Sequence, residues 1–500
     1  MKQKQELLGV ITGIFIFSLL FHRQDLGLNL LIFELIYLAY LVLTKQLDFK
    51  KINILIYSLA VLLTVFFTVL IHSVFSFIMN FVAVFILVGL IIYPEIKSIL
   101  NSIALAFNNS IQSQVVFLRK LSGTQLKGKR LGTYLWKSRI FVIPLFIILI
   151  FILIYRNSNP VFDKIVTKII STLNDFLLSV FKNFDALILV TLFIGLVICN
   201  FLIFKSKNQK VIDSDVGSTD ALIRKTVRRF RSFKITGLRN ELKAGIFLLF
   251  ILNILILAIN VIDIIWVWFG FEWEGEYLKQ FVHEGTYLLI LSILISIVLV
   301  LYFFRGNLNF YKNNRLLKIL SFIWLAQNGI LTISVAFRNF WYISYFSLAY
   351  KRIGVFIFLV MTLYGLYSVV IKVKDKKSSF YLFRKNSQFI FFLLVVCSLV
   401  NWDVVIANYN FNKADTSFLH LNFMATLSDK ALPYLDKSLS EVQSIDSVQK
   451  DKFRFKEKFM TPFEYNSLIQ NRKFQFKEKW VNKSWLEWNF AEYRAFMKLR

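Results

Sequence analysis

Residues 266–287 read WVWFGFEWEGEYLKQFVHEGTY and separate two long apolar runs, Ala244–Ile265 and Tyr287–Phe303. The stretch concentrates acidic and aromatic side chains in a chain that is otherwise apolar or basic. Its ionisable residues include Glu272, Glu274, Glu276, His283 and Glu284. A helix of about 20 apolar residues crosses a hydrocarbon core of about 30 Å. The pattern therefore predicts an acidic connection between two membrane-spanning helices.

The composition is typical of an integral membrane protein. Of the 500 residues, 57% are hydrophobic and 18% are charged, whereas about a quarter of the residues of a soluble domain are charged. The long runs are apolar around the whole helix, which argues against a large soluble helical protein. The predicted fold class is an all-α integral membrane protein, a multi-pass bundle of about eleven transmembrane helices with a small, mostly helical C-terminal tail domain.

Eleven apolar runs are expected to span the membrane. The first follows a basic start but lacks a small-x-small cleavage site, so we expect a retained span rather than a signal peptide. The runs are Leu7–Phe21, Leu26–Leu43, Ile52–Ile71, Ser73–Tyr93, Ile140–Tyr155, Leu187–Phe204, Ala244–Ile265, Tyr287–Phe303, Leu317–Phe337, Ile353–Ile371 and Phe389–Ile406. Two mixed stretches, Ser98–Leu118 and Val161–Leu187, are predicted to lie in the interface, with a re-entrant course as the alternative.

The charge pattern predicts the orientation. The net charge is +29, and Lys and Arg gather after every even-numbered run. Because positive loops stay in the cytoplasm, the N-terminus is expected inside and the tail outside; an even count with an internal tail is the alternative. The expected regions are 1–204 (about six spans), 205–243 (a basic cytoplasmic loop), 244–406 (a core of about five spans) and 407–500 (an extracytoplasmic tail).

The tail contains an internal echo, in which KFRFKEKF at residues 452–459 recurs as KFQFKEKW at residues 473–480. A duplicated helical unit and a chance repeat of a biased composition both explain it. Basic and aromatic interleaving also occurs on nucleic-acid surfaces, but an external tail would rarely meet nucleic acid. We expect the Lys side chains to meet lipid phosphates and the rings to lie at the interface.

No cofactor or metal site is predicted. HEGT at residues 283–286 fails the HExxH pattern because residue 287 is Tyr, and no phosphate-binding, hydrolase or kinase motif occurs. Cys199 and Cys397 lie inside apolar runs and are expected to pack there. For the four acidic residues of the opening stretch, a divalent-cation site and a solvated acidic loop are both open interpretations.

Polar residues near the predicted spans form the candidate site. A carboxylate such as Glu34, in the middle of a span, is costly unless it is protonated, paired or facing water. Arg338 begins the second predicted outer loop and could pair with Asp263, Glu284 or Asp403. Amides such as Asn253 and Gln327 are expected to bond between helices. The full candidate cluster is Glu34, Asp263, His283, Glu284, Arg338, Arg352 and Asp403.

Five stretches carry a resemblance to known families. They are VHEGTYLLI (282–290), RNFWYISYFSLAYKRIGV (338–355), NWDVVIANYN (401–410), LSDKALPYL (427–435) and WNFAEYRA (488–495). In this order they resemble two related bacterial membrane families that are known only as domains of unknown function, DUF4153 and DUF4173, over roughly residues 242–500. The resemblance implies a multispanning protein of the bacterial cytoplasmic (inner) membrane and transfers no reaction. Where this chain has YFSLAY, the related motif often reads YGLT.

Three functions are compatible with these features. The first is a non-enzymatic envelope accessory or sensory component that contacts the lipid bilayer and binds an envelope protein or ligand through its outer loops and tail. The second is a proton- or ion-coupled transporter that uses Glu34 and the polar residues within the spans. The third is an enzyme acting on lipid or glycan with His283 or Glu284 as acid or base. The lack of catalytic motifs favours the first.

Overall fold

The structure is a computed structural model that describes residues 2–122, 125–126, 129–130, 144, 147–149, 151–156, 158–180, 185, 187–224, 236–269, 277–453 and 459–500. Side-chain positions are described for these residues except 2–4, 125–126, 129–130, 173–180, 236, 277–284 and 451. Glu272, Glu274 and Glu276 therefore lie outside the described residues, as do the side chains of His283 and Glu284.

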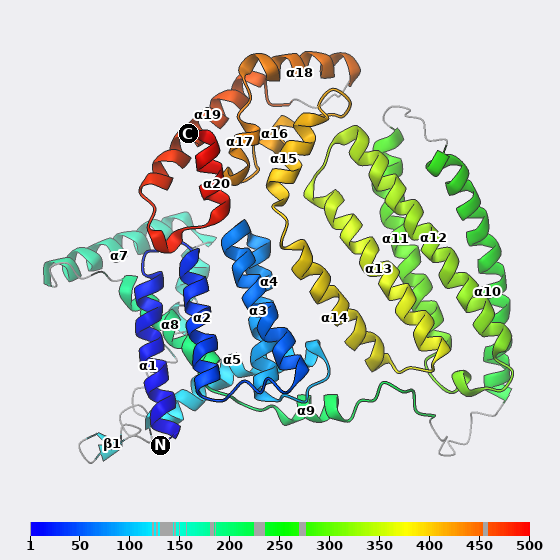
Figure 1. Cartoon of the computed structure of the whole chain (residues 1–500), viewed down its shortest axis with the longest axis horizontal. Helices are drawn as coiled ribbons and strands as arrows, with labels where there is room; N and C mark the ends of the chain where they lie inside the picture. The colour runs from blue at the N-terminus through cyan, green and yellow to red at the C-terminus, as the bar shows by residue number, and fades with distance from the viewer. Residues whose placement is uncertain are drawn as a thin grey trace.

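The fold is a pair of helical bundles side by side with a helical domain over one end (Figure 1). The N-terminal bundle consists of α1 (Lys2–Phe21), α2 (Leu28–Leu43), α3 (Ile52–Ile71), α4 (Val74–Ile92), α5 (Ile99–Ser122) and α8 (Leu187–Ile203). The strands β1 (Gln125–Leu126) and β2 (Lys129–Arg130) form a short antiparallel pair. The helix α7 (Pro160–Val180) lies crosswise to α1 and α2, as an interfacial helix would (Figure 1).

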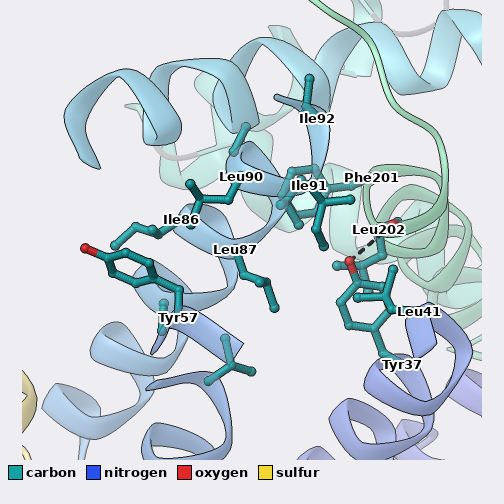
Figure 2. Close-up of a cluster of buried hydrophobic side chains, with 14 of the residues drawn as sticks. Tyr37, Leu41, Tyr57, Ile86, Leu87, Leu90, Ile91, Ile92, Phe201 and Leu202 are labelled. Carbon is teal, nitrogen blue, oxygen red and sulfur yellow. Dashed lines mark hydrogen bonds between the residues drawn. The ribbon is translucent and has the colours of Figure 1, made fainter. Parts of the chain in front are cut away.

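Large apolar side chains fill the N-terminal bundle. Figure 2 shows Tyr37 of α2 and Leu87 of α4 among them, and the Tyr37 hydroxyl donates a hydrogen bond of 3.2 Å to the carbonyl of Leu202 in α8. The expected interfacial stretch at Ser98–Leu118 forms α5, which packs closely on α4 and α8. The buried Asn109 amide donates to the carbonyls of Phe201 and Phe204, so α5 is fixed to the end of α8.

The second bundle begins with α10 (Thr236–Asp263), which continues as the π-helix η1 (Ile264–Phe269). It goes on with α11 (Tyr277–Phe303), the 3-10 turn η2 (Asn307–Phe310), α12 (Arg315–Phe346), α13 (Tyr350–Lys374) and α14 (Ser379–Cys397). The ring of Tyr57 in α3 lies 5.6 Å from that of Phe391 in α14, which joins the bundles.

The described part of the 205–243 connection also joins the bundles. Its helix α9 (Gln209–Val216) carries the buried Asp215, whose carboxylate accepts hydrogen bonds from the backbone N–H groups of Lys97 and Ser98. Further along, Asp220 forms an ion pair with Arg384 of α14. The connection is therefore tied to both bundles at the end where the N-terminus lies (Figure 1).

The tail forms a helical domain with its own core. It consists of α15 (Trp402–Asn412), α16 (Leu421–Met424), η3 (Asp429–Ala431), α17 (Leu432–Leu435), α18 (Leu439–Lys452), α19 (Pro462–Val481), η4 (Trp485–Glu487) and α20 (Phe490–Leu499). Leu432, Leu435, Tyr465 and Ile469 are buried together, and Ile353 of α13 belongs to the same core. The second copy of the echo lies within α19. In the first copy, Lys452 ends α18, and the other described residues, Phe453 and Phe459, are not helical.

Hydropathy and exposure identify a multi-pass membrane protein. Within the described ranges, seven helices are long and apolar enough to cross a membrane: α3, α4, α10 with η1, α11, α12, α13 and α14. The helices α1, α2 and α8 are shorter and also apolar. Large apolar side chains such as Phe247 and Val298 are exposed on the second bundle, where lipid would cover them. The count of about eleven spans stays a prediction because the fifth run is described only in part.

Three predicted boundaries are wrong. The run expected to end at Phe337 continues as α12 to Phe346, because the helix supplies its polar residues with buried partners. The run Ala244–Ile265 is expected to end before Trp266, where the acidic connection would start, but the chain stays helical to Phe269 as η1. The eleventh run is two helices, since α14 ends at Cys397 and the Asn401 side chain caps α15 by accepting from the Val404 N–H.

Candidate functional site

The predicted cluster is divided among separate places. Glu34 lies in the N-terminal bundle, Asp263 and Arg338 lie together in the second bundle, and Asp403 lies at the root of the tail. The backbone of α11 passes close to the Arg338 guanidinium, since a Cβ built on Gly285 would be 3.6 Å from Arg338 Nη1.

Glu34 is part of a small polar group between three helices. The Asn80 Nδ2 of α4 donates to a Glu34 carboxylate oxygen at 3.0 Å and lies 3.4 Å from Thr64 Oγ1 of α3. Glu34 is only 6% exposed. The group links α2, α3 and α4 by hydrogen bonds where water is excluded, a role that amide and hydroxyl side chains often have between transmembrane helices.

We expect Glu34→Gln to change the free energy of unfolding by less than about 1 kcal/mol, because the Gln carbonyl still accepts from Asn80. Glu34→Ala removes that acceptor and opens a cavity, at a cost of about 2–4 kcal/mol. Denaturant unfolding of the purified protein in detergent measures both values. Equal losses for the two variants would show that the carboxylate charge itself is required.

Asp263 and Arg338 form a buried ion pair between α10 and α12. The distance between Arg338 Nη2 and Asp263 Oδ1 is 2.5 Å, and both side chains are less than a tenth exposed. The other oxygen, Asp263 Oδ2, accepts no hydrogen bond from the described residues. Below the pair, Gln327 Nε2 donates to Asn253 Oδ1 at 2.8 Å, so the predicted interhelical role of the amides is observed. Of the three carboxylates predicted as partners of Arg338, Asp263 is paired with it. Asp403 contacts Lys430 instead, and the side chain of Glu284 lies outside the described residues.

Arg352 closes the end of α12. Its Nη1 donates to the carbonyl of Phe346 at 2.5 Å and also to that of Ser347, which has a left-handed φ of 66°. The guanidinium lies 4.5 Å from the centre of the Tyr342 ring. The guanidinium thus satisfies carbonyl groups that the end of a helix leaves without intrahelical partners.

Asp403 belongs to a network that joins the tail to α3. Its carboxylate accepts from the hydroxyls of Tyr350 and Ser428 and lies 3.5 Å from Lys430 Nζ. The same ammonium donates to the carbonyls of Ile71 and His72, at 3.3 and 2.8 Å. Burial lowers the pKa of Lys430, partly opposed by Asp403. One buried cation thus bridges the C-terminal end of α3 and the tail.

A second polar group lies beside the first. His72 has a left-handed φ of 51°, and its Nε2 is 3.6 Å from Glu492 Oε1 of α20. Glu492 also accepts from Lys483 and from Asn489 Nδ2. Burial lowers the pKa of His72 to about 4, so the imidazole is neutral near pH 7. Burial favours protonated Glu492, but Lys483, His72 and Asn489 together outweigh this effect, and the pKa of Glu492 is lowered.

Sequence reasoning missed Lys430, His72, Lys483 and Glu492 as members of a site. Their contacts join residues far apart in the chain, as Lys430 and His72 show with a separation of 358 positions. A signal was nevertheless present, because Asp403, Lys430 and Glu492 fall in three of the stretches that carry the family resemblance. The structure brings those three stretches together at the C-terminal end of α3.

A family model described as a domain of unknown function (DUF4153) matches residues 10–438. The matched region covers both bundles and the tail as far as α17, so the resemblance extends well into the N-terminal half. No curated protein and no solved structure matches the chain. Within the described residues, no group of three or more His, Cys, Asp or Glu side chains is arranged to hold a metal ion.

Proposed function

The chain belongs to the DUF4153 family, and from this premise we propose that it is a non-enzymatic accessory or sensory component of the bacterial cell envelope. In this proposal the helices anchor the protein in the cytoplasmic membrane. The tail domain, α15–α20, is the part that engages an envelope ligand or partner.

The carrying observation is that polar contacts fasten the tail to the N-terminal bundle and, through the Tyr350 hydroxyl and the Asp403 carboxylate, to the second bundle. The backbone N–H of Leu28 donates to the carbonyl of Trp488 at 3.0 Å, and that of Asp25 donates to Glu487 Oε1 at 3.0 Å. Lys430 joins the tail to the end of α3, as described above. A domain held at several points can transmit a change at its surface to the membrane helices, which supports a sensory or accessory role.

The charge distribution supports an extracytoplasmic tail. At the end of the bundles where the N-terminus lies, the connections are basic; they carry Lys45, Lys50, Lys51, Lys97, Lys205, Lys207, Lys210, Arg305, Lys312, Lys376 and Lys377. At the other end, the described α1–α2, α3–α4 and α12–α13 turns are short and carry only Arg23 and Asp25 as formally charged residues. The described part of the segment before α8, which reaches this end where Asp185 pairs with Arg23, adds charges of both signs (Asp163, Lys164, Lys168 and Asp185). Positive loops remain in the cytoplasm, so this pattern favours a tail on the outer side.

The transporter alternative has less support. Glu34 and Asp263, the two acidic residues within described apolar helices that prompted it, lie in different bundles. Each is engaged locally, by Asn80 in one case and by Arg338 in the other. A transport path would need polar groups that face a shared aqueous route.

A cross-linking experiment tests the proposed role. A photoreactive residue replaces Phe463 or Phe474, which are 70% and 69% exposed on α19, in cells that express the full chain. The matched control carries it at Phe247 of α10, which is 70% exposed on an apolar helix. We expect discrete envelope cross-links from α19 only. Cross-links to lipid alone at all three positions would contradict the proposal.

The docking itself gives a second test. A Cβ built on Gly27 would be 2.4 Å from the Glu487 carbonyl oxygen, so Gly27→Ala forces η4 away from the α1–α2 turn. We expect a loss of about 1–3 kcal/mol of local stability, measured as faster amide hydrogen exchange in α20. Gly354→Ala is the control, because a Cβ there meets no atom within 4 Å. Unchanged exchange in Gly27→Ala would contradict this docking contact.

A further inference from the structure

A cavity of about 170 Å³ lies where the tail meets the N-terminal bundle. Its walls come from the end of α3, from α15, from the η3–α17 segment and from α20. These elements are neighbours at the outer end of the bundle (Figure 1). The functions considered above make no use of this cavity.

The lining of the cavity is cationic. Lys430, Arg494 and Lys498 contribute positive charge, and no Asp or Glu lies among its described lining residues. Asp403, 3.5 Å from Lys430 Nζ, neutralises part of this charge, and Glu492, which is itself paired with Lys483, also attracts Lys430. Arg494 has no hydrogen bond or ion pair with the described residues. The cavity therefore retains an excess of positive charge that an anion would balance.

Geometry holds two of the cations in place. Lys498 Nζ donates to the Tyr434 hydroxyl at 2.8 Å and lies 4.5 Å from the centre of the Tyr434 ring. Lys430 is 7% exposed and is fixed by the carbonyls of Ile71 and His72. Cations with restricted positions bind a multi-oxygen anion with a smaller loss of conformational entropy.

The position of the cavity suggests the rest of the ligand. The helix α3 has 20 residues, which corresponds to about 30 Å, the thickness of the hydrocarbon core. Its last residues, Leu70 and Ile71, line the cavity together with Val404 and Phe490. The cationic part thus lies at the level of the lipid head groups and has an apolar border.

We propose that this cavity binds the phosphate group of an anionic amphiphile, with Arg494 and Lys498 as its direct partners and Lys430 behind them. Phosphate and guanidinium groups form strong charge-assisted hydrogen bonds. The same chemistry would accept a free phosphate, and the experiment distinguishes the two sources. The inference rests on the proposed function in one respect only, namely that the end of the N-terminal bundle that meets the tail faces outward.

The test uses the purified full chain in a neutral detergent and titration calorimetry with three probes: dioctanoyl phosphatidic acid, dioctanoyl phosphatidylcholine and inorganic phosphate. We expect saturable binding of phosphatidic acid and weaker binding of phosphatidylcholine, whose choline cation is repelled. In Arg494→Gln/Lys498→Gln the dissociation constant for phosphatidic acid should rise roughly tenfold or more. Both side chains are exposed, so we expect the variant to fold.

The control is Lys477→Gln/Arg500→Gln, which removes the same charge from tail positions that do not line the cavity. Equal affinity in the two double variants, or no saturable binding of any probe, would overturn the site. If inorganic phosphate binds as tightly as phosphatidic acid, the site recognises free phosphate and the proposal of an amphiphilic ligand is wrong. If phosphatidic acid does not bind but the α19 cross-links form, the cavity proposal fails and the proposed function stands. If phosphatidic acid binds but the α19 cross-links do not form, the proposed function fails and the cavity proposal stands.

Discussion

Arg338→Met is expected to lower the free energy of unfolding by about 3–5 kcal/mol, the largest effect of any substitution considered. The pair with Asp263 is buried at 2.5 Å between two apolar helices. Removing the guanidinium leaves a carboxylate whose other oxygen already accepts no hydrogen bond from the described residues. An unpaired buried charge in a medium of low dielectric constant costs several kcal/mol.

The double variant Arg338→Met/Asp263→Asn separates the charge effect from the loss of packing. Neutralising the carboxylate removes the unpaired charge, so the double variant should recover most of the stability that Arg338→Met loses. Denaturant unfolding in detergent of the wild type, both single variants and the double variant gives the coupling free energy. Strictly additive losses would show that the two side chains do not stabilise each other.

Acidification is expected to loosen the tail. His72 faces Glu492 and lies near Lys483, Lys430 and Asp25, and burial lowers its pKa from 6.5 to about 4. The docked tail therefore binds fewer protons than the released tail, and docking stability is lost as the pH falls below 6.5. The pKa difference corresponds to a loss of about 3 kcal/mol at pH 4. The lowered pKa of Glu492 acts in the same direction below its usual value of 4.5.

Amide hydrogen exchange in α20 measures this effect, after correction for the intrinsic pH dependence of exchange. His72→Asn should flatten the response between pH 6.5 and pH 4, because Asn does not titrate and tolerates the left-handed φ of 51° at this position. His22→Asn is the control, since His22 contacts Asp185 and not the tail. A pH response that persists unchanged in His72→Asn would show that another group is responsible.

The sequence predicts those parts of the fold that depend on local hydropathy. The predicted run Ile52–Ile71 coincides with α3, because nearly every side chain in it is apolar and the backbone must satisfy its own hydrogen bonds in lipid. The predicted helix boundaries are wrong where a contact with a residue far away in the sequence determines the local structure. The helix α12 continues past Arg338 because Asp263, 75 positions earlier in the chain, pairs with that arginine. A hydropathy profile cannot predict such a pair.

The candidate site was predictable in part for the same reason. Glu34, Asp263, Arg338 and Asp403 are recognisable in the sequence because a polar residue in or near an apolar run is unusual. Which of them meet could not be predicted, since α2, α10 and α15 have no fixed relation in the sequence. Lys430 and His72 looked like ordinary loop residues; their importance arises from tail docking, which burial and geometry alone reveal.

The contact between Gly27 and Glu487 also sets an order of assembly. Synthesis proceeds from the N-terminus, so the α1–α2 turn is made 460 residues before the segment that covers it. The α1–α2 turn and the end of α3 are therefore synthesised before the tail segments that cover them. The tail can cover these two places only after the chain of both bundles has been made.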